Sequence, residues 1–168
     1  MEIKTSGAGV VVKIDDQDFH LLGGRTIATY VLKSGKLDVI VGNKRLHNII
    51  MDAKFIDHID GDRANNTRSN LRLATIQQNN FNRKKSPGLS SQYKGVSWDG
   101  RRWVANIRFN RELIYILSST TDEMKCAQAY DRKAKEFFNE FARLNFPMSA
   151  QSNRTATHSD LAMGTAKA

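Results

Sequence analysis

Short apolar runs alternate with turn residues over the first 46 residues of the chain, a pattern that predicts strands. The runs Val10–Ile14, Ile27–Leu32 and Leu37–Val41 have strand length, and glycine-containing turns separate them. The acidic segment 15–18 followed by Leu21-Leu22 indicates one or two helical turns, since acidic residues stabilise a helix N-terminus. The N-terminal part is therefore expected to be β-rich.

After residue 92 the pattern predicts three strands and then one helix. The strands are expected at Tyr93–Trp98, Trp103–Phe109 and Leu113–Leu117, with Asp99-Gly100 as a hairpin turn. Thr120 and Glu123 have the spacing of a capping box, which predicts the start of the helix. Apolar residues then recur every three or four positions and form one helix face before Pro147: Met124, Ala127, Tyr130, Ala134, Phe137, Phe141 and Leu144.

The composition supports a folded protein without membrane spans. The chain has 168 residues, of which 40% are hydrophobic and 26% charged, enough apolar material for real cores. No run approaches the ~18 apolar residues of a membrane span, and the N-terminus lacks the pattern of a signal peptide. The single cysteine, Cys126, excludes an internal disulfide and a cysteine-built zinc site. We therefore expect a soluble intracellular protein that is neither secreted nor bound to membranes.

Most of the positive charge lies in one stretch of the sequence. The net charge is +9, and residues 82–112 hold eight basic side chains against Asp99 and Glu112, which is +6 of that total. A concentrated basic field attracts polyanions, and nucleic acid is the usual one. On charge alone, a solvated surface with a biased linker is an equal alternative.

Candidate chemistry lies between Met51 and Asn82. A histidine beside carboxylates is followed, about one helix away, by a cluster of carboxamides. The segments are Asp57-His58-Ile59-Asp60-Gly61-Asp62, Asn65-Asn66, Ser69-Asn70-Leu71-Arg72 and Gln77-Gln78-Asn79-Asn80. Phosphodiester hydrolysis needs a base for water, a divalent cation on the phosphate and stabilisation of the leaving oxygen. One His, one Asp and one Asn can meet these needs, whereas turns and solvated side chains are the structural alternative for such segments.

These motifs, in this order and at these distances, resemble the HNH endonucleases, also called ββα-metal or His-Me finger nucleases, and in particular phage and intron homing endonucleases. The resemblance implies that His58 is the general base and that Asp57 is a metal ligand. It further implies that Asn70 braces the loop and that Asn79, rather than Asn80, is the second protein ligand. Two oxygen ligands suit magnesium, with manganese as the alternative, better than zinc.

Two features depart from that family. Its members have a His-Arg pair on the strand before the finger, where this chain has His47-Asn48, and residues 47–57 form a shorter hairpin. These departures motivate one alternative, a DNA-binding protein whose nuclease module is inactive. A zinc-stabilised structural module is a further alternative, which the single cysteine disfavours.

A second set of motifs resembles the APETALA-two/ethylene-response-factor DNA-binding domain over about residues 92–147. The motifs are Tyr93–Trp98, Arg102–Arg108, Ala127–Asp131 and Leu144–Pro147. In that family a three-stranded sheet lies in the DNA major groove. Period-two alternation places Arg102, Val104, Asn106 and Arg108 on one face of the second strand. The expected DNA-binding residues, including the basic linker, are Arg83, Lys84, Lys85, Lys94, Ser97, Arg101, Arg102, Asn106 and Arg108.

Together these patterns and resemblances predict an α+β protein. A β-rich segment leads into a ββα-metal finger, and a three-stranded antiparallel sheet packed on one helix follows. The expected domains are an HNH nuclease domain at 1–83 (finger about 45–83), a linker at 84–91, a DNA-binding domain at 92–147 and a disordered tail at 148–168. The expected function is metal-dependent hydrolysis of double-stranded DNA, in bacterial cytoplasm if the gene is phage-borne. A single such site nicks one strand, and a homodimer or repeated attack would be needed to cut both.

Overall fold

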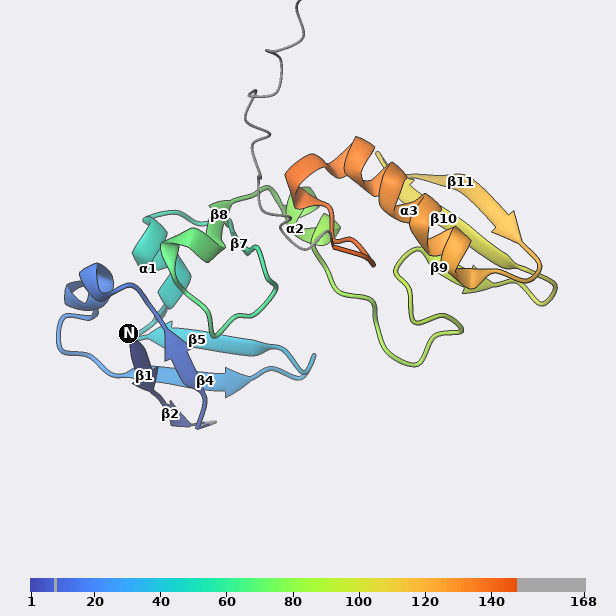
Figure 1. Cartoon of the computed structure of the whole chain (residues 1–168). Helices are drawn as coiled ribbons and strands as arrows, with labels where there is room; N and C mark the ends of the chain where they lie inside the picture. The colour runs from blue at the N-terminus through green and yellow to red at the C-terminus, as the bar shows by residue number, and fades with distance from the viewer. Residues whose placement is uncertain (8, 148–168) are drawn as a thin grey trace, which may run out of the picture.

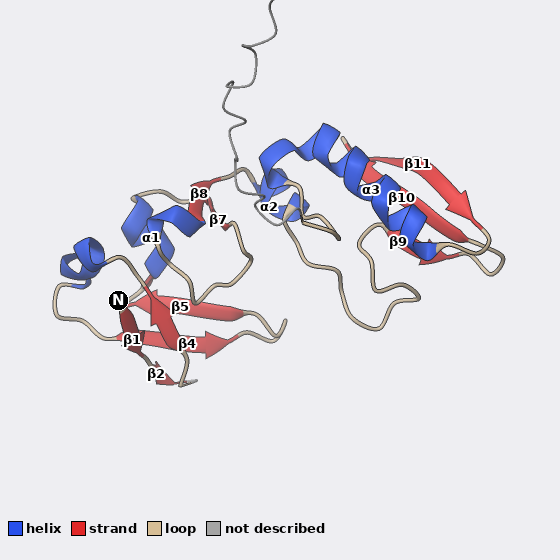
Figure 2. Ribbon diagram, in the orientation of Figure 1, coloured by secondary structure: helices blue, strands red, loops and turns tan. Residues whose placement is uncertain are grey.

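The computed structural model describes residues 1–7 and 9–147 and has two lobes with a short helix, α2, between them (Figure 1). Strands and helices are mixed in both lobes, as Figure 2 shows, so the predicted α+β class is confirmed. The predicted tail at 148–168 lies outside the described residues. Within the described part of the chain, no helix is long and apolar enough to cross a membrane.

The N-terminal lobe consists of two small sheets and a core between them. Its strands are β1 (Glu2–Lys4), β2 (Ser6–Gly7), β3 (Val11–Lys13), β4 (Ile27–Val31), β5 (Leu37–Val41) and β6 (Lys44–Arg45). β1 pairs with β3, and the second sheet has the order β2-β4-β5-β6. A 3-10 helix η1 (Asp16–Leu22) stands where the acidic segment predicts helical turns. Apolar side chains from these elements and from helix α1 (Leu46–Met51) form one buried core.

The finger follows directly from this core. Along the chain its elements are strand β7 (Ile56–His58), a 3-10 turn η2 (Arg68–Asn70), strand β8 (Leu71–Leu73) and helix α2 (Ile76–Phe81). β7 and β8 pair antiparallel. A capping box begins α2, since the Thr75 hydroxyl accepts from Gln78 N–H at 3.1 Å and the Gln78 side chain accepts from Thr75 N–H at 2.8 Å. The predicted β, β, α order of the finger is therefore present.

The C-terminal lobe is a three-stranded antiparallel sheet with one long helix on one face. Its elements are β9 (Val96–Trp98), β10 (Trp103–Phe109), β11 (Glu112–Ser119), α3 (Glu123–Phe138) and a 3-10 turn η3 (Asn139–Phe141). Ala105 and Ile107 of β10 are buried against α3, whereas Arg108 is exposed. The predicted alternation of this strand is therefore confirmed, with a register shift between Ala105 and Asn106.

Three local predictions were wrong. Asp122, and not Thr120, caps α3, because its carboxylate accepts from Lys125 N–H at 2.9 Å. Helix α3 ends at Phe138, where Asn139 has φ 48° and reverses the chain, so Phe141 and Leu144 do not continue the helix. His47 lies in helix α1 and not on a strand before the finger.

The lobes contact each other through aromatic and polar side chains. The rings of Phe81 on α2 and Phe138 on α3 are stacked, with centroids 3.8 Å apart. Lys85 donates to Val96 O at 3.0 Å, and Lys94 donates to the carbonyl of Phe81. Residues 84–91 form neither helix nor strand. The domain boundaries, including this linker, stay predictions.

Candidate active site

His58 ends strand β7 and lies at the floor of a cleft, only 7% exposed. Its Nε2 is 3.2 Å from Asn66 Oδ1. The Asn66 amide nitrogen donates to Arg63 O at 2.9 Å, which leaves the amide oxygen facing the histidine. A neutral His58 therefore carries its proton on Nε2, and the lone pair on Nδ1 is available as a base.

The surroundings of His58 favour its neutral form. Burial lowers the pKa of His58 below its usual value, and the hydrogen bond to Asn66 opposes this in part. The ring of His47, on α1, meets that of His58 edge to face at 5.1 Å. Burial, followed by the neighbouring His58, lowers the pKa of His47 to about 4. Both imidazoles are therefore unprotonated at neutral pH.

Asp57 is 4% exposed and lies directly opposite Arg72 in the β7–β8 register. Arg72 donates to Asp57 Oδ2 from Nη2 at 2.7 Å and from Nε at 3.0 Å. The amide nitrogen of Asn82 lies 3.2 Å from Oδ1 and 3.1 Å from Oδ2, and it also donates to His58 O at 2.7 Å. The carboxylate is therefore held mainly through Oδ2, and Oδ1 receives only the longer contact.

Asn79 and Asn70 occupy different parts of the finger. Asn79, on α2, donates to Ile56 O at 2.9 Å, and its amide oxygen accepts no hydrogen bond from the described residues. Asn70 accepts from Asp60 N–H at 3.0 Å and donates to Asp60 Oδ1 at 2.9 Å and Asn65 O at 2.8 Å. These three bonds tie the ends of the loop between β7 and β8 together.

The donor set fits a hard divalent cation with few protein ligands. Asp57 and Asn79 line the same cleft as His58, and each offers one oxygen atom that is not saturated by hydrogen bonds. Nowhere in residues 1–7 and 9–147 do three or more His, Cys, Asp or Glu side chains group around a potential metal position. Two oxygen ligands, completed by water and phosphate, match the preference of magnesium and not that of structural zinc.

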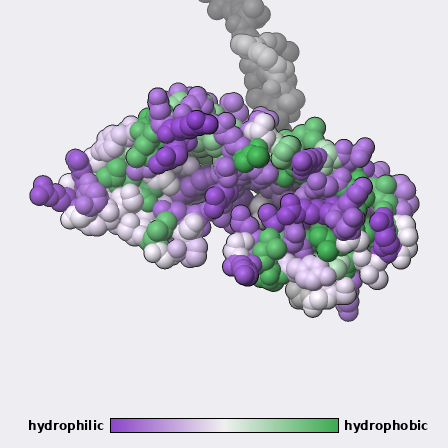
Figure 3. Space-filling view, turned by 180° about the vertical axis from the view of Figure 1, so that it is seen from behind, coloured by the Kyte–Doolittle hydropathy of each residue, from purple (hydrophilic) through white to green (hydrophobic). Residues whose placement is uncertain are grey.

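Basic side chains surround this cleft, whose volume is about 800 Å³. One wall comes from the β4–β5 hairpin at residues 34–37, and the other comes from residues 83–87 after α2. Seen from behind, hydrophilic residues gather at the junction of the lobes (Figure 3). The basic residues that line the cleft are Lys36, Arg45, Lys54, Arg63, Arg83, Lys84 and Lys85, against the carboxylates of Asp57 and Asp62. The cleft therefore suits a polyanion.

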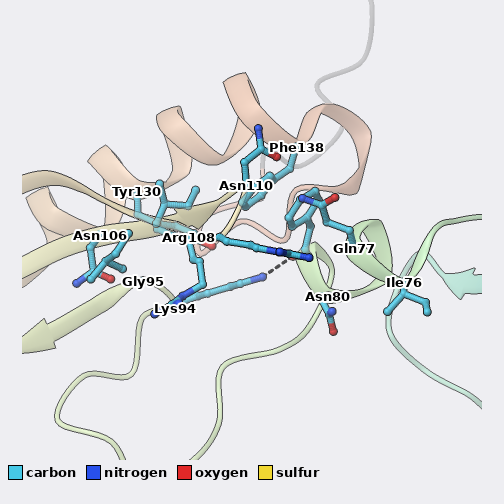
Figure 4. Close-up of a pocket in the computed structure, with 14 residues that line it drawn as sticks. Ile76, Gln77, Asn80, Lys94, Gly95, Asn106, Arg108, Asn110, Tyr130 and Phe138 are labelled. Atoms are coloured by element: carbon cyan, nitrogen blue, oxygen red, sulfur yellow. Dashed lines mark hydrogen bonds between the residues drawn. The ribbon is translucent and has the colours of Figure 1, made fainter.

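A second hollow, of about 1120 Å³, lies beside the other face of α2 (Figure 4). Gln77 and Asn80 of α2 line one wall, and Asn106 and Arg108 of β10 line the other. Lys94 also lines it, but its ammonium group donates to the carbonyl of Phe81, and burial lowers its pKa to about 8. Helix α2 thus separates the cleft at His58 from a hollow at the sheet that both polar and apolar side chains line.

The structure divides the predicted DNA-binding residues between these two places. Arg83, Lys84 and Lys85 line the cleft at His58, whereas Lys94, Asn106 and Arg108 line the second hollow. Ser97, Arg101 and Arg102 are exposed on β9 and on the turn after it, and Arg102 pairs with Asp99 at 3.3 Å. Their role in DNA binding stays a prediction.

Sequence reasoning missed three residues that hold the site. Asn66 and Arg72 lie in motifs quoted for the family resemblance, but no role was expected for either. Asn82, one of the buried polar residues, was not singled out. Asn82 could have been found from its position three residues after Asn79, since residues three apart lie on the same face of a helix. No local signal marks Asn66 or Arg72, because their partners are distant in the sequence.

Comparison with known proteins gives a family model that matches the finger and relatives that match longer parts of the chain. Residues 47–81 match the model of the HNH endonuclease family. A protein of Acanthamoeba polyphaga mimivirus, named as an HNH endonuclease, is 38% identical over 127 residues, which cover 69% of this chain and 65% of that relative. Protein 3.8 of Escherichia phage T7 is 44% identical over 48 residues, 29% of this chain and 40% of that protein.

The chain thus spans less than two thirds of the length of either curated relative. No solved structure matches. The resemblance of the second set of motifs to the APETALA-two domain stays a prediction. Over residues 47–81 the chain matches the HNH endonuclease domain, and a homologue carries the name of that family.

Proposed function

We propose that this protein is a metal-dependent endonuclease that nicks duplex DNA, with His58 as the general base. The observation that carries the proposal is the His58 imidazole, oriented by Asn66 on the floor of a basic cleft that Asp57 and Asn79 also line. Similarity to HNH endonucleases over residues 47–81 supports the same activity.

In the proposed reaction, Nδ1 of His58 takes a proton from the attacking water. Nε2 keeps its hydrogen bond to Asn66 Oδ1, which stabilises the imidazolium that forms and fixes the ring plane. Asp57 and Asn79 would hold a magnesium ion through oxygen atoms, and the ion would stabilise negative charge on the phosphate and on the departing 3′ oxygen. The expected products therefore carry 5′-phosphate and 3′-hydroxyl ends.

The cleft walls would hold the two sides of the duplex backbone. Lys84 is exposed on the wall after α2, and Lys36 is exposed on the opposite wall from the β4–β5 hairpin. Lysine side chains contact phosphates without reading bases, so they fix the position of the duplex over His58. A monomer with one such cleft would cut one strand in each binding event.

Supercoiled plasmid with magnesium tests the proposal. Wild-type protein should convert it to open circles, EDTA should stop the reaction, and His58→Ala should lower the rate by at least ~100-fold, as for loss of a general base. His20→Ala is the matched control, because His20 is exposed on η1 and does not line the cleft. Metal-dependent nicking that survives His58→Ala would contradict the assignment of the base.

The ion pair between Asp57 and Arg72 favours a second candidate function, that of a DNA-binding protein with an inactive nuclease module. The Asp57 carboxylate is engaged by Arg72 and Asn82, and a guanidinium beside a carboxylate opposes the approach of a cation. In that case the protein would retard duplex DNA in a gel-shift assay, and no nicked product would form at any magnesium or manganese concentration.

A further inference from the structure

Arg72 connects the finger to the C-terminal lobe. On one side its Nε and Nη2 donate to Asp57 Oδ2. On the other side its Nη1 donates to Glu140 O at 2.6 Å, and its Cζ lies 3.9 Å from the centre of the Phe141 ring. The side chain is only 15% exposed. All three guanidinium nitrogens are therefore engaged, by groups from two lobes.

Residues 139–143, which we call the clamp, owe their position to the end of α3. The positive φ of Asn139, 48°, turns the chain back toward the finger, and Phe141 is buried at 7% exposure. Arg143 then donates from Nη1 to Asp60 O at 2.9 Å in the loop of the finger. In Figure 1 the C-terminal end of α3 lies beside α2.

If Arg72 contacted only the Asp57 carboxylate, its guanidinium plane could still turn about the bonds of the arginine side chain. The hydrogen bond to Glu140 O and the face of the Phe141 ring define the guanidinium plane. That plane decides how Arg72 meets Asp57, because the fork of an arginine binds carboxylates directionally. With Oδ2 held in this way, Oδ1 of Asp57 stays directed away from Arg72.

We propose that the clamp of the C-terminal lobe positions Asp57 through Arg72, so that this lobe supports the chemistry at the finger as well as holding DNA. Arg72 is here a positioning residue. The inference rests on the proposed function, since it concerns Asp57 as a ligand of the cation. It predicts that a change in the clamp lowers metal affinity and turnover at a site on the other lobe.

The test uses full-length variants in a double-mutant cycle. Arg72→Lys keeps the positive charge but loses the directional fork, and Phe141→Leu keeps an apolar side chain but loses the ring over the guanidinium. We expect Arg72→Lys to lower kcat for plasmid nicking by ~10–100-fold and Phe141→Leu by ~10-fold, as for supporting groups around a metal ligand. KM for DNA should change by less than about twofold.

In the double variant, Phe141→Leu should cause no further loss of kcat, because its effect passes through Arg72. The matched control is Phe146→Leu, since Phe146 packs on Tyr93 within the C-terminal lobe and should leave kcat unchanged. Thermal unfolding of each variant without metal checks that the lobes remain folded. Losses that add in the double variant, or a rise in KM alone, would overturn the inference.

Manganese binding in the absence of DNA, measured by electron paramagnetic resonance, is the readout that does not depend on turnover. We expect ~10-fold weaker binding in both single variants. Tighter binding in Arg72→Lys would overturn the inference, because Arg72 would then compete with the cation. If the wild-type protein does not nick DNA, the proposed function fails, while manganese affinity still shows whether the clamp controls Asp57.

Discussion

Asn66→Ala is the most informative single perturbation of the candidate site. Asn66 has 0% exposure, and its amide group makes two hydrogen bonds, one with His58 and one with Arg63 O. Truncation removes both bonds, which leaves the buried His58 Nε2 and the partly buried Arg63 O without these partners. Each partner left without its bond costs about 1–3 kcal/mol, and the bond to Arg63 O is only partly buried, so we expect about 2–4 kcal/mol of lost stability.

The loss should stay local because the loop backbone has its own anchor. Asn66 N–H donates to Lys13 O at 2.8 Å, and Lys13 N–H donates to Ala64 O at 2.8 Å, and neither bond involves the amide side chain. The variant should therefore fold, and urea unfolding should measure the expected change. Asn43→Ala, in the exposed turn after β5, is the matched control and should change stability by less than ~0.5 kcal/mol.

Activity should respond in rate and in pH dependence. Without Asn66 the His58 ring is free to rotate and to change tautomer, so the plateau rate should fall by ~10–100-fold. The hydrogen bond to Asn66 raises the pKa of His58 against the effect of burial, so its loss should lower that pKa further. Since the base acts unprotonated, the acid limb of the pH–rate profile should move to lower pH.

Asn66→Asp should move that limb in the opposite direction. A carboxylate at Nε2 favours the imidazolium and raises the pKa of His58, so the midpoint of the acid limb should lie at higher pH than in the wild type. Nicking rates of the two variants between pH 4.5 and 8 check this. An unchanged plateau in Asn66→Ala, or limbs that do not move, would refute the reasoning that Asn66 orients the base.

Three further perturbations test other parts of the structure. In the folded protein the pKa of His47 is about 4, below its unfolded value of 6.5, so the free energy of unfolding of the wild type falls as the pH drops from 6.5 to 4. His47→Gln should remove this part of the pH dependence. Urea unfolding should show a difference of about 1–2 kcal/mol after allowance for solvent screening. Gly95→Ala should cost about 2–4 kcal/mol, because Gly95 has φ +76° and a Cβ there would overlap the ring of Tyr130. Gly100→Ala is the control, since Gly100 has φ +100° but open space around it, and it should lower the free energy of unfolding by less. Thermal unfolding of both variants measures the difference. Lys84→Ala should reduce the slope of log Kd against log salt by ~0.9 for duplex DNA, and an unchanged slope would remove Lys84 from the phosphate contacts.

Local patterns in the sequence predicted much of the secondary structure. Alternation placed β10 at Trp103–Phe109, as observed, because side-chain periodicity reports which face of an element is buried. The β7, β8, α2 arrangement was expected from the family resemblance of the finger motifs and not from periodicity. Reasoning from local patterns failed at the ends of α3, where Asp122 competed with Thr120 for the cap and where one backbone turn at Asn139 ended the helix.

The residue types for the candidate chemistry could also be selected from the sequence, since His58, Asp57 and Asn79 all line one cleft. Their roles stay predictions. What could not be predicted is how each side chain is held. Asn66, Arg72 and Asn82 bind the site through partners 8, 15 and 24 or 25 positions away, and no periodicity within a strand or helix specifies such pairs.

The sequence by itself thus determined much of the secondary structure of this protein, the concentration of positive charge after the finger and the candidate base. Only the tertiary structure decided which oxygen of Asp57 remains available and which lobe supports it. The physical reason is the range of the interactions. Hydrophobic periodicity acts within one element, whereas Arg72 contacts Glu140 O across 68 positions and Arg143 contacts Asp60 O across 83, and such contacts form only once both lobes have folded.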